Sequence, residues 1–118
     1  DMIDVIGTDI YQYDSLQYKE QLDKELAIMT TIGKQHDKPI ALTETGLEGI
    51  PDSTWWTQTL LPIVSKYPLS YMLVWRNARE KVTHFYAPYP GQVSADDFVE
   101  FYNSPKTLFI GDDFELYK

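Results

Sequence analysis

Residues 38–46 are Lys38-Pro39-Ile40-Ala41-Leu42-Thr43-Glu44-Thr45-Gly46. The apolar residues 40–42 follow one another without interruption, between a proline and a glycine. A short apolar run with such boundaries is typical of a fully buried strand in a parallel sheet. Glu44 then lies at the carboxyl end of a buried strand, where parallel sheets and barrels hold their functional groups. The stretch therefore predicts a parallel fold and also supplies a candidate catalytic carboxylate.

The segments on both sides of this run alternate between strand and helix patterns. Strands are expected at residues 2–12 and 69–75, and helices at 14–33, 54–66 and 95–102. Asp14-Ser15 should cap the first helix and Gly33 should end it. Pro62 should kink the second helix, which Asp52 or Ser53 should cap, and Ser94 should cap the third. Residues 107–118 could pack back onto the domain or trail away from it.

The order β-α-β-α-β-α requires a parallel sheet that is covered by helices, so the fold class is α/β. Three strands are few, because the edges of a parallel sheet need protection. Two architectures fit: a small three-layer α/β domain, or the last three βα units of a (β/α)8 TIM barrel. The chain opens directly onto the strand expected at residues 2–12, so we expect further residues upstream. That start and the polar residues at every strand end favour the partial barrel.

Composition excludes several classes of function. The 118 residues carry a net charge of -8, with a pI near 4.5, which argues against binding to nucleic acid or to an anionic membrane surface. No run of residues is long and apolar enough for a membrane span. Cysteines are absent, and His36 and His84 are far apart, so we expect no metal and no cofactor. The aromatic content of 14% suits a sugar ligand as well as a well-filled core.

Candidate functional side chains come at the ends of all three expected strands. Tyr11 with Asp9 ends the first, Glu44 the second, and Trp75 with Arg76 the third. In a barrel these ends converge on one face. A glycosidase needs a carboxylate that a neighbour orients and that attacks the anomeric carbon of a sugar. A tyrosine hydroxyl could hold Glu44, and a tryptophan could form the floor of a sugar site.

Each candidate also has a structural explanation. Glu44 could cap the following helix or pair with Arg76, and Asp9 could tie loops together at the rim. Tyr11 could be a core aromatic with its hydroxyl at the rim, and Trp75 a core residue.

Two loop residues are open in the same way. Glu48 is a rival acid, but its place in a loop next to Gly49 favours a solvated carboxylate. His84, with the aromatic residues that follow it, could line a substrate cleft or belong to a loop that packs on its own aromatics.

Several ordered motifs carry a resemblance to a known family. They are Asp9-Ile10-Tyr11-Gln12, Ala41-Leu42-Thr43-Glu44-Thr45-Gly46, Trp55-Trp56, Leu73-Val74-Trp75-Arg76-Asn77 and the stretch from His84 to Gln92. Together they resemble the C-terminal part of glycoside hydrolase family 26 β-mannanases. The resemblance implies a (β/α)8 barrel of which this chain supplies the sixth, seventh and eighth units, so that residues 1–118 form the C-terminal portion of a catalytic domain.

The resemblance also implies roles for these residues. Glu44 matches the nucleophile of a retaining mechanism, and Tyr11 matches the tyrosine that hydrogen-bonds it. Trp75 matches a residue at the sugar subsite before the scissile bond, and Arg76 can touch the next subsite. Asp9 matches a supporting acid at the rim. His84 lies in a matched stretch and is expected to bind substrate.

The function implied is a retaining endo-β-1,4-mannanase acting on mannan or galactomannan, secreted, periplasmic or at the cell surface. The family's acid/base glutamate stands in a His-Glu pair at an earlier strand, and this chain has no such pair. We therefore expect the isolated chain to be inactive, and to self-associate or to need a second chain that carries the rest of the barrel. The alternative is a non-catalytic structural or carbohydrate-binding piece, or part of a related β-glycanase.

Overall fold

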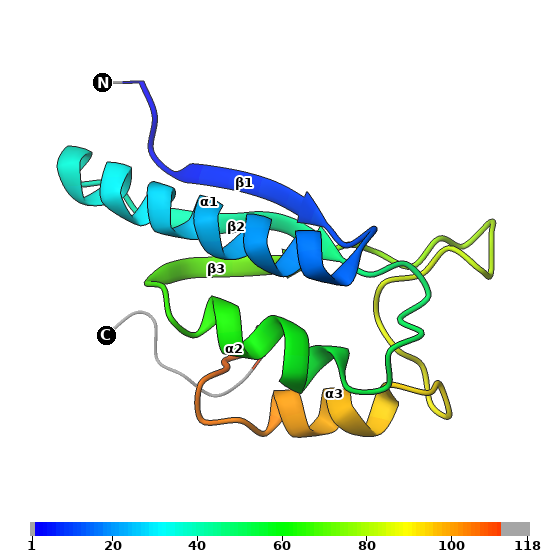
Figure 1. The fold of residues 1–118 in the computed structure, drawn as a ribbon. Coiled ribbons are helices and arrows are strands. Elements are labelled where there is room, and N and C mark those ends of the chain that lie inside the picture. The colour runs from blue at the N-terminus through cyan, green and yellow to red at the C-terminus, as the bar shows by residue number, and fades with distance from the viewer. Residues whose placement is uncertain (1, 112–118) are drawn as a thin grey trace.

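The computed structural model describes residues 2–111, which form one parallel sheet with helices between its strands. The elements are β1 (Ile6–Tyr11), α1 (Ser15–His36), β2 (Ile40–Gly46), η1 (Trp55–Leu60), α2 (Leu61–Val64), β3 (Leu69–Val74) and α3 (Ala95–Tyr102). The strand order is β1-β2-β3, and both pairs of neighbours are parallel (Figure 1). The expected α/β class and the alternation of strands and helices are confirmed.

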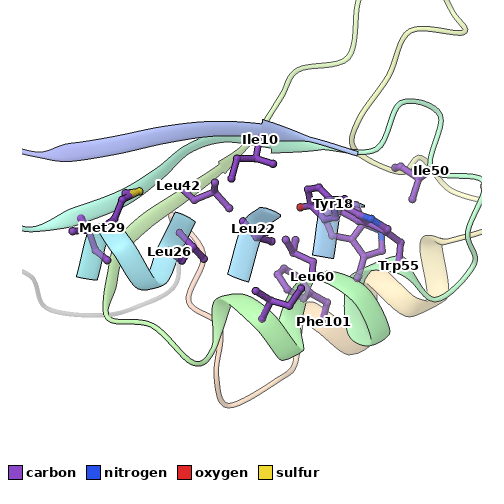
Figure 2. Packing of buried hydrophobic residues seen from close by; sticks show 13 residues of the cluster. Ile10, Tyr18, Leu22, Leu26, Met29, Leu42, Ile50, Trp55, Leu60 and Phe101 are labelled. Carbon is purple, nitrogen blue, oxygen red and sulfur yellow. The ribbon is translucent and has the colours of Figure 1, made fainter. Parts of the chain in front are cut away.

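The core lies between the sheet and the helices. Ile10 of β1 and Leu42 of β2 point toward Leu22 and Leu26 of α1, and Leu60 closes the cluster from below (Figure 2). Burying each such leucine or isoleucine contributes about 1.5–3 kcal/mol to folding. Both tryptophans of the expected second helix, Trp55 and Trp56, are also buried in this cluster. This core attaches the helices to one face of the sheet.

The other face of the sheet carries no helix in the described part of the chain. Two large apolar side chains of β3 lie on it, Tyr71 with 49% and Leu73 with 42% of its surface exposed. A three-layer domain would cover both faces with helices. The described residues instead form two layers, so the three-layer alternative is wrong for this part of the chain.

The first helix is longer than its glycine predicts. Asp14 caps it as expected, accepting a hydrogen bond from the Gln17 backbone N–H at 2.9 Å. Gly33 does not end it: the helix continues to His36, and Asp37 takes the left-handed conformation with φ 51°. A Cβ atom at Gly33 would lie 2.8 Å from the Ile40 side chain. The glycine therefore serves the close approach of α1 to β2.

The expected second helix is divided. Residues 55–60 form a π-helical turn, and α2 begins directly after it, with Pro62 at its second position. A proline is tolerated in a first turn because its missing N–H needs no partner there. The expected kink is thus a change of helix type. Asp52 accepts a hydrogen bond from the Thr54 backbone N–H at 3.0 Å, just before the turn begins.

The expected cap at Ser94 is confirmed in position but not in its hydrogen bond. Ser94 stands at the start of α3 but makes no capping bond. Its buried hydroxyl donates to the Gln92 side chain at 2.6 Å and accepts from the Trp56 indole N–H at 3.1 Å. A buried indole N–H needs an acceptor, and this requirement prevails over capping.

The segment after α3 folds back as far as it is described. Thr107 donates from its hydroxyl to the Phe101 carbonyl at 2.7 Å, and the Phe109 ring lies edge-on to Phe101 at 5.9 Å. The rest of the expected 107–118 segment, residues 112–118, lies outside the described residues. No helix within residues 2–111 combines the length and the apolar character that crossing a membrane requires.

Candidate active site

The site begins with the way β1 alternates between the two faces of the sheet. Thr8 faces the helices, where its hydroxyl donates to Glu25 of α1 at 2.6 Å, and Ile10 faces the core. Because successive side chains of a strand point to opposite faces, Asp9 and Tyr11 project from the open face.

A β-bulge brings Glu44 to the same open face. Thr8 pairs with Leu42, but Asp9 pairs with Glu44, so Thr43 is an extra residue in β2. Strict alternation from Leu42, which faces the core, would turn Glu44 toward the helices. The bulge instead places Thr43 and Glu44 together on the open face, and bulges commonly re-aim a side chain in this way.

Glu44 is held by Tyr11. The Tyr11 hydroxyl donates to Glu44 Oε2 at 2.7 Å, across the two neighbouring strand ends. Burial raises the pKa of Tyr11 well above its usual value, and the hydrogen bond to Glu44 raises it further. The hydroxyl therefore stays protonated near neutral pH and remains a donor. A carboxylate held in one orientation by a fixed donor is suited to attack an electrophilic carbon.

Asp9 is engaged with the bulge itself. Its carboxylate accepts a hydrogen bond from the hydroxyl of Thr43 on the adjacent strand. The same hydroxyl lies 3.0 Å from the Thr8 carbonyl oxygen. This arrangement fits a supporting acid that fixes the strand ends, the role expected for Asp9.

Of the two candidate residues after β3, Trp75 lies next to the strand that carries Glu44, whereas Arg76 is paired elsewhere. The Trp75 backbone N–H donates to the Thr45 carbonyl at 3.1 Å, which seats Trp75 beside the end of β2. Arg76 forms an ion pair with Glu80, with 3.7 Å between Nη2 and Oε1, in an exposed loop. It therefore does not pair with Glu44, as the structural explanation of Glu44 would require. An exposed pair of this kind contributes little to stability. Arg76 is thus left near the rim, where its guanidinium is accessible.

His84 connects two loops. Its Nδ1 lies 2.7 Å from Glu48 Oε1, so the rival acid is engaged with the histidine. The His84 ring also lies edge-on to Tyr86, with 5.3 Å between ring centroids.

Sequence reasoning named Tyr86 only as one of the aromatic residues after His84 and gave Asn77 no role of its own, whereas the structure places Tyr86 beside Tyr11 and Asn77 beside Tyr86. The Tyr86 ring packs edge-on against the Tyr11 ring, with 5.5 Å between the ring centroids. The Asn77 side chain accepts a hydrogen bond from the Tyr86 backbone N–H and donates one to the Ala87 carbonyl. The available signal was Gly46, whose missing side chain leaves the space that Tyr86 fills.

The chemistry of the site is that of a single oriented carboxylate. Within residues 2–111 no group of three or more His, Asp or Glu side chains is placed to hold a metal ion. Retaining glycoside hydrolysis needs two carboxyl groups about 5–5.5 Å apart. Of the neighbouring acids, Asp9 is bonded to Thr43 and Glu48 to His84. The described residues therefore present one carboxylate that a tyrosine orients, with the two neighbouring acids engaged by other partners.

Comparison with solved structures gives a consistent set of relatives. The chain matches a GH26 β-mannanase from Bacteroides ovatus, BoMan26A, with 74% identity and a TM-score of 0.95, over 99% of this chain and 34% of that one. An endo-β-1,4-mannanase double mutant from Cellulomonas fimi matches with 29% identity and a TM-score of 0.75, over 91% of this chain and 26% of that one. The catalytic domain of a Bacillus sp. JAMB-750 GH26 endo-β-1,4-mannanase matches with 25% identity and a TM-score of 0.76, over 91% and 32%.

The resemblance to glycoside hydrolase family 26 β-mannanases is thereby confirmed over nearly the whole chain. The chain spans about a third of the length of BoMan26A and about a quarter of the C. fimi enzyme. Comparison with protein-family models and with curated proteins gives no match.

Proposed function

We propose that this chain, which resembles part of the family 26 β-mannanases, supplies the nucleophile half of a retaining endo-β-1,4-mannanase. The observation that carries the proposal is the hydrogen bond from Tyr11 to Glu44 at the carboxyl end of β2. It occurs in a chain that is 74% identical to a segment of a GH26 β-mannanase. The substrate class is β-1,4-mannan or galactomannan.

The proposed architecture is the last three βα units of a (β/α)8 barrel. Two features support it: the strands are parallel in sequential order, and between residues 2 and 111 the helices cover only one face of the sheet. In a closed barrel the open face would become the packed interior. The polar group at the strand ends would then lie at the carboxyl end of the barrel, where barrel enzymes carry their active sites.

The proposed mechanism starts with attack of Glu44 on the anomeric carbon. The bond from that carbon to the glycosidic oxygen breaks, a glycosyl-enzyme ester forms, and an acid supplied by the earlier barrel units protonates the leaving oxygen. Water then hydrolyses the ester, and the configuration is retained. The Tyr11 hydroxyl holds the Glu44 carboxylate in place through its hydrogen bond to Oε2.

Sugar binding is assigned to the residues around this centre. The Trp75 backbone lies beside the end of β2, so its indole is assigned as the floor of a sugar site, and the exposed Arg76 guanidinium can donate to sugar hydroxyls. Asp9 pairs with Glu44 across the two neighbouring strands, and His84 lies in the loop that carries Tyr86; these two residues complete the proposed set. A location outside the cytoplasm, whether secreted, periplasmic or at the cell surface, rests on the family resemblance alone.

The experiment is replacement of Glu44 in the complete barrel that contains this chain. Glu44→Ala should abolish release of reducing sugar from mannan while the fold is kept, and azide should restore part of the activity by filling the space of the carboxylate. Glu20→Ala, on the exposed side of α1, is the matched control and should leave the rate unchanged. Activity of Glu44→Ala within a few fold of the parent would refute the assignment.

A further inference from the structure

Tyr86 is buried against Gly46, the last residue of β2. The side chain retains only 9% of its exposed surface. A Cβ atom built on Gly46 would lie 2.4 Å from Cδ1 of the Tyr86 ring, so the ring rests directly on the glycine backbone. Its edge meets the Tyr11 ring, with 5.5 Å between centroids and 67° between planes. Tyr86 thus contacts both the strand that carries Glu44 and the tyrosine that holds it.

The loop that carries Tyr86 is fixed to its own strand end by Asn77. The Asn77 Oδ1 atom accepts from the backbone N–H groups of Tyr86 and Ala87, each at 2.9 Å. Its amide nitrogen donates to the Ala87 carbonyl at 3.0 Å. One side chain therefore makes three hydrogen bonds to two successive residues, which sets the place of the Tyr86 backbone.

The same loop is fixed to the loop that follows β2. The Gly49 backbone N–H donates to the Phe85 carbonyl at 2.7 Å, one residue before Tyr86. The residues just before this pair are also in contact, because His84 Nδ1 lies 2.7 Å from Glu48 Oε1. Tyr86 is therefore held from three directions, whereas Tyr11 lies at the end of β1, a strand that pairs on one side only within the described residues.

We propose that Tyr86 is a positioning residue for the nucleophile and acts through Tyr11. The edge contact stops the Tyr11 ring from swinging away from β2, and so keeps its hydroxyl on Glu44. Displacing reacting groups by about 1 Å can cost a rate factor of about 100. The inference rests on the proposed role of Glu44, and it explains why residue 46 is a glycine and why Asn77 follows β3.

The test is a double-mutant cycle in the complete barrel. Tyr86→Leu removes the ring that packs on Tyr11 and should lower kcat about tenfold with KM nearly unchanged, because in this proposal Tyr86 acts on the nucleophile through Tyr11 and makes no contact with the sugar. Tyr86→Phe keeps the ring and should retain the parental rate. In a Tyr11→Phe background, Tyr86→Leu should cause no further loss, since the hydroxyl through which it acts is already gone.

A second variant tests the same contact from the other side. Gly46→Ala should displace the Tyr86 ring, lower kcat to a similar extent, and also add nothing to Tyr11→Phe. A crystal structure of Tyr86→Leu supplies a readout that needs no activity: the distance from the Tyr11 hydroxyl to Glu44 should exceed hydrogen-bonding range.

The outcomes separate this inference from the proposed function. Losses that add fully to Tyr11→Phe, a rise in KM alone, or an unchanged Tyr11–Glu44 distance would overturn the positioning role. Those results could occur while Glu44→Ala is still inactive, and the proposed function would then stand. An active Glu44→Ala enzyme would refute the proposed function instead. Thermal melting of every variant shows whether a loss comes from unfolding.

Discussion

Leu42 and Thr45 are three residues apart in one strand, yet both are completely buried and both face the helices. In a regular strand residues at this separation point to opposite faces. The bulge at Thr43 removes the conflict and leaves Thr43 and Glu44 together on the open face. The burial of two helix-facing residues is thus what fixes the direction of the candidate nucleophile.

The first prediction concerns the anchor after the bulge. The Thr45 hydroxyl lies 2.7 Å from the hydroxyl of Tyr18 on α1, and both groups are buried. Tyr18→Phe leaves the threonine hydroxyl without this partner, so the free energy of unfolding, measured in urea, should fall by about 1–3 kcal/mol. The double variant Tyr18→Phe with Thr45→Val should lose less than the sum of the two single changes. Strictly additive losses would mean that the two hydroxyls do not interact in solution.

The second prediction concerns the hydroxyl of Tyr11. Tyr11→Phe in the complete barrel removes a hydrogen bond to a charged group, which is worth about 1.5–3 kcal/mol, and should lower kcat roughly 10- to 150-fold. Glu44→Ala should lose far more, because it removes the attacking atom itself. Initial rates on mannan measure both variants. A larger loss for Tyr11→Phe than for Glu44→Ala would reverse the roles assigned to the two residues.

The sequence allowed prediction of those features that follow from local pattern. The apolar run 40–42 and its boundaries predict a buried parallel strand, and the polar residue that follows it lies at the carboxyl end. The meeting of Tyr11 with Glu44 follows from neighbouring parallel strands of similar length.

Features that depend on contacts between distant segments could not be predicted. Gly33 signals a helix end by its propensity, but the close approach of β2 keeps it inside α1. Ser94 signals a cap, but the buried Trp56 indole takes its hydroxyl. The bulge in β2 depends on the register of two strands at once, and no local pattern encodes that register. The place of Tyr86 likewise depends on Gly46, far away in the sequence.

The third prediction concerns the activity of the isolated 118-residue chain. It should release reducing sugar from mannan far more slowly than a complete family 26 enzyme, because general acid catalysis contributes about 10²–10⁴-fold and residues 2–111 offer no unengaged acid near Glu44 for the leaving group. The measurement is reducing-sugar release by pure chain at several concentrations. Robust release would show that Asp9 or Glu48 replaces the missing acid, despite their bonds to Thr43 and His84.

The last prediction concerns assembly. Within the described residues β1 and β3 each pair on one side only, so both present a row of unpaired backbone groups. The open face adds the exposed side chains of Tyr71 and Leu73. Unpaired strand edges and exposed apolar surface both favour association with another chain. The purified chain at micromolar concentration should therefore sediment as an oligomer, or should bind a polypeptide that supplies the earlier barrel units.

Adding that polypeptide should convert the oligomer into a one-to-one complex with mannanase activity, since the new units bring a carboxyl group close to Glu44. A variant with Tyr71→Lys and Leu73→Lys serves as the control: it should self-associate less, because charge blunts the apolar face. A compact monomer with cooperative unfolding would contradict the partial barrel and would favour a self-contained domain.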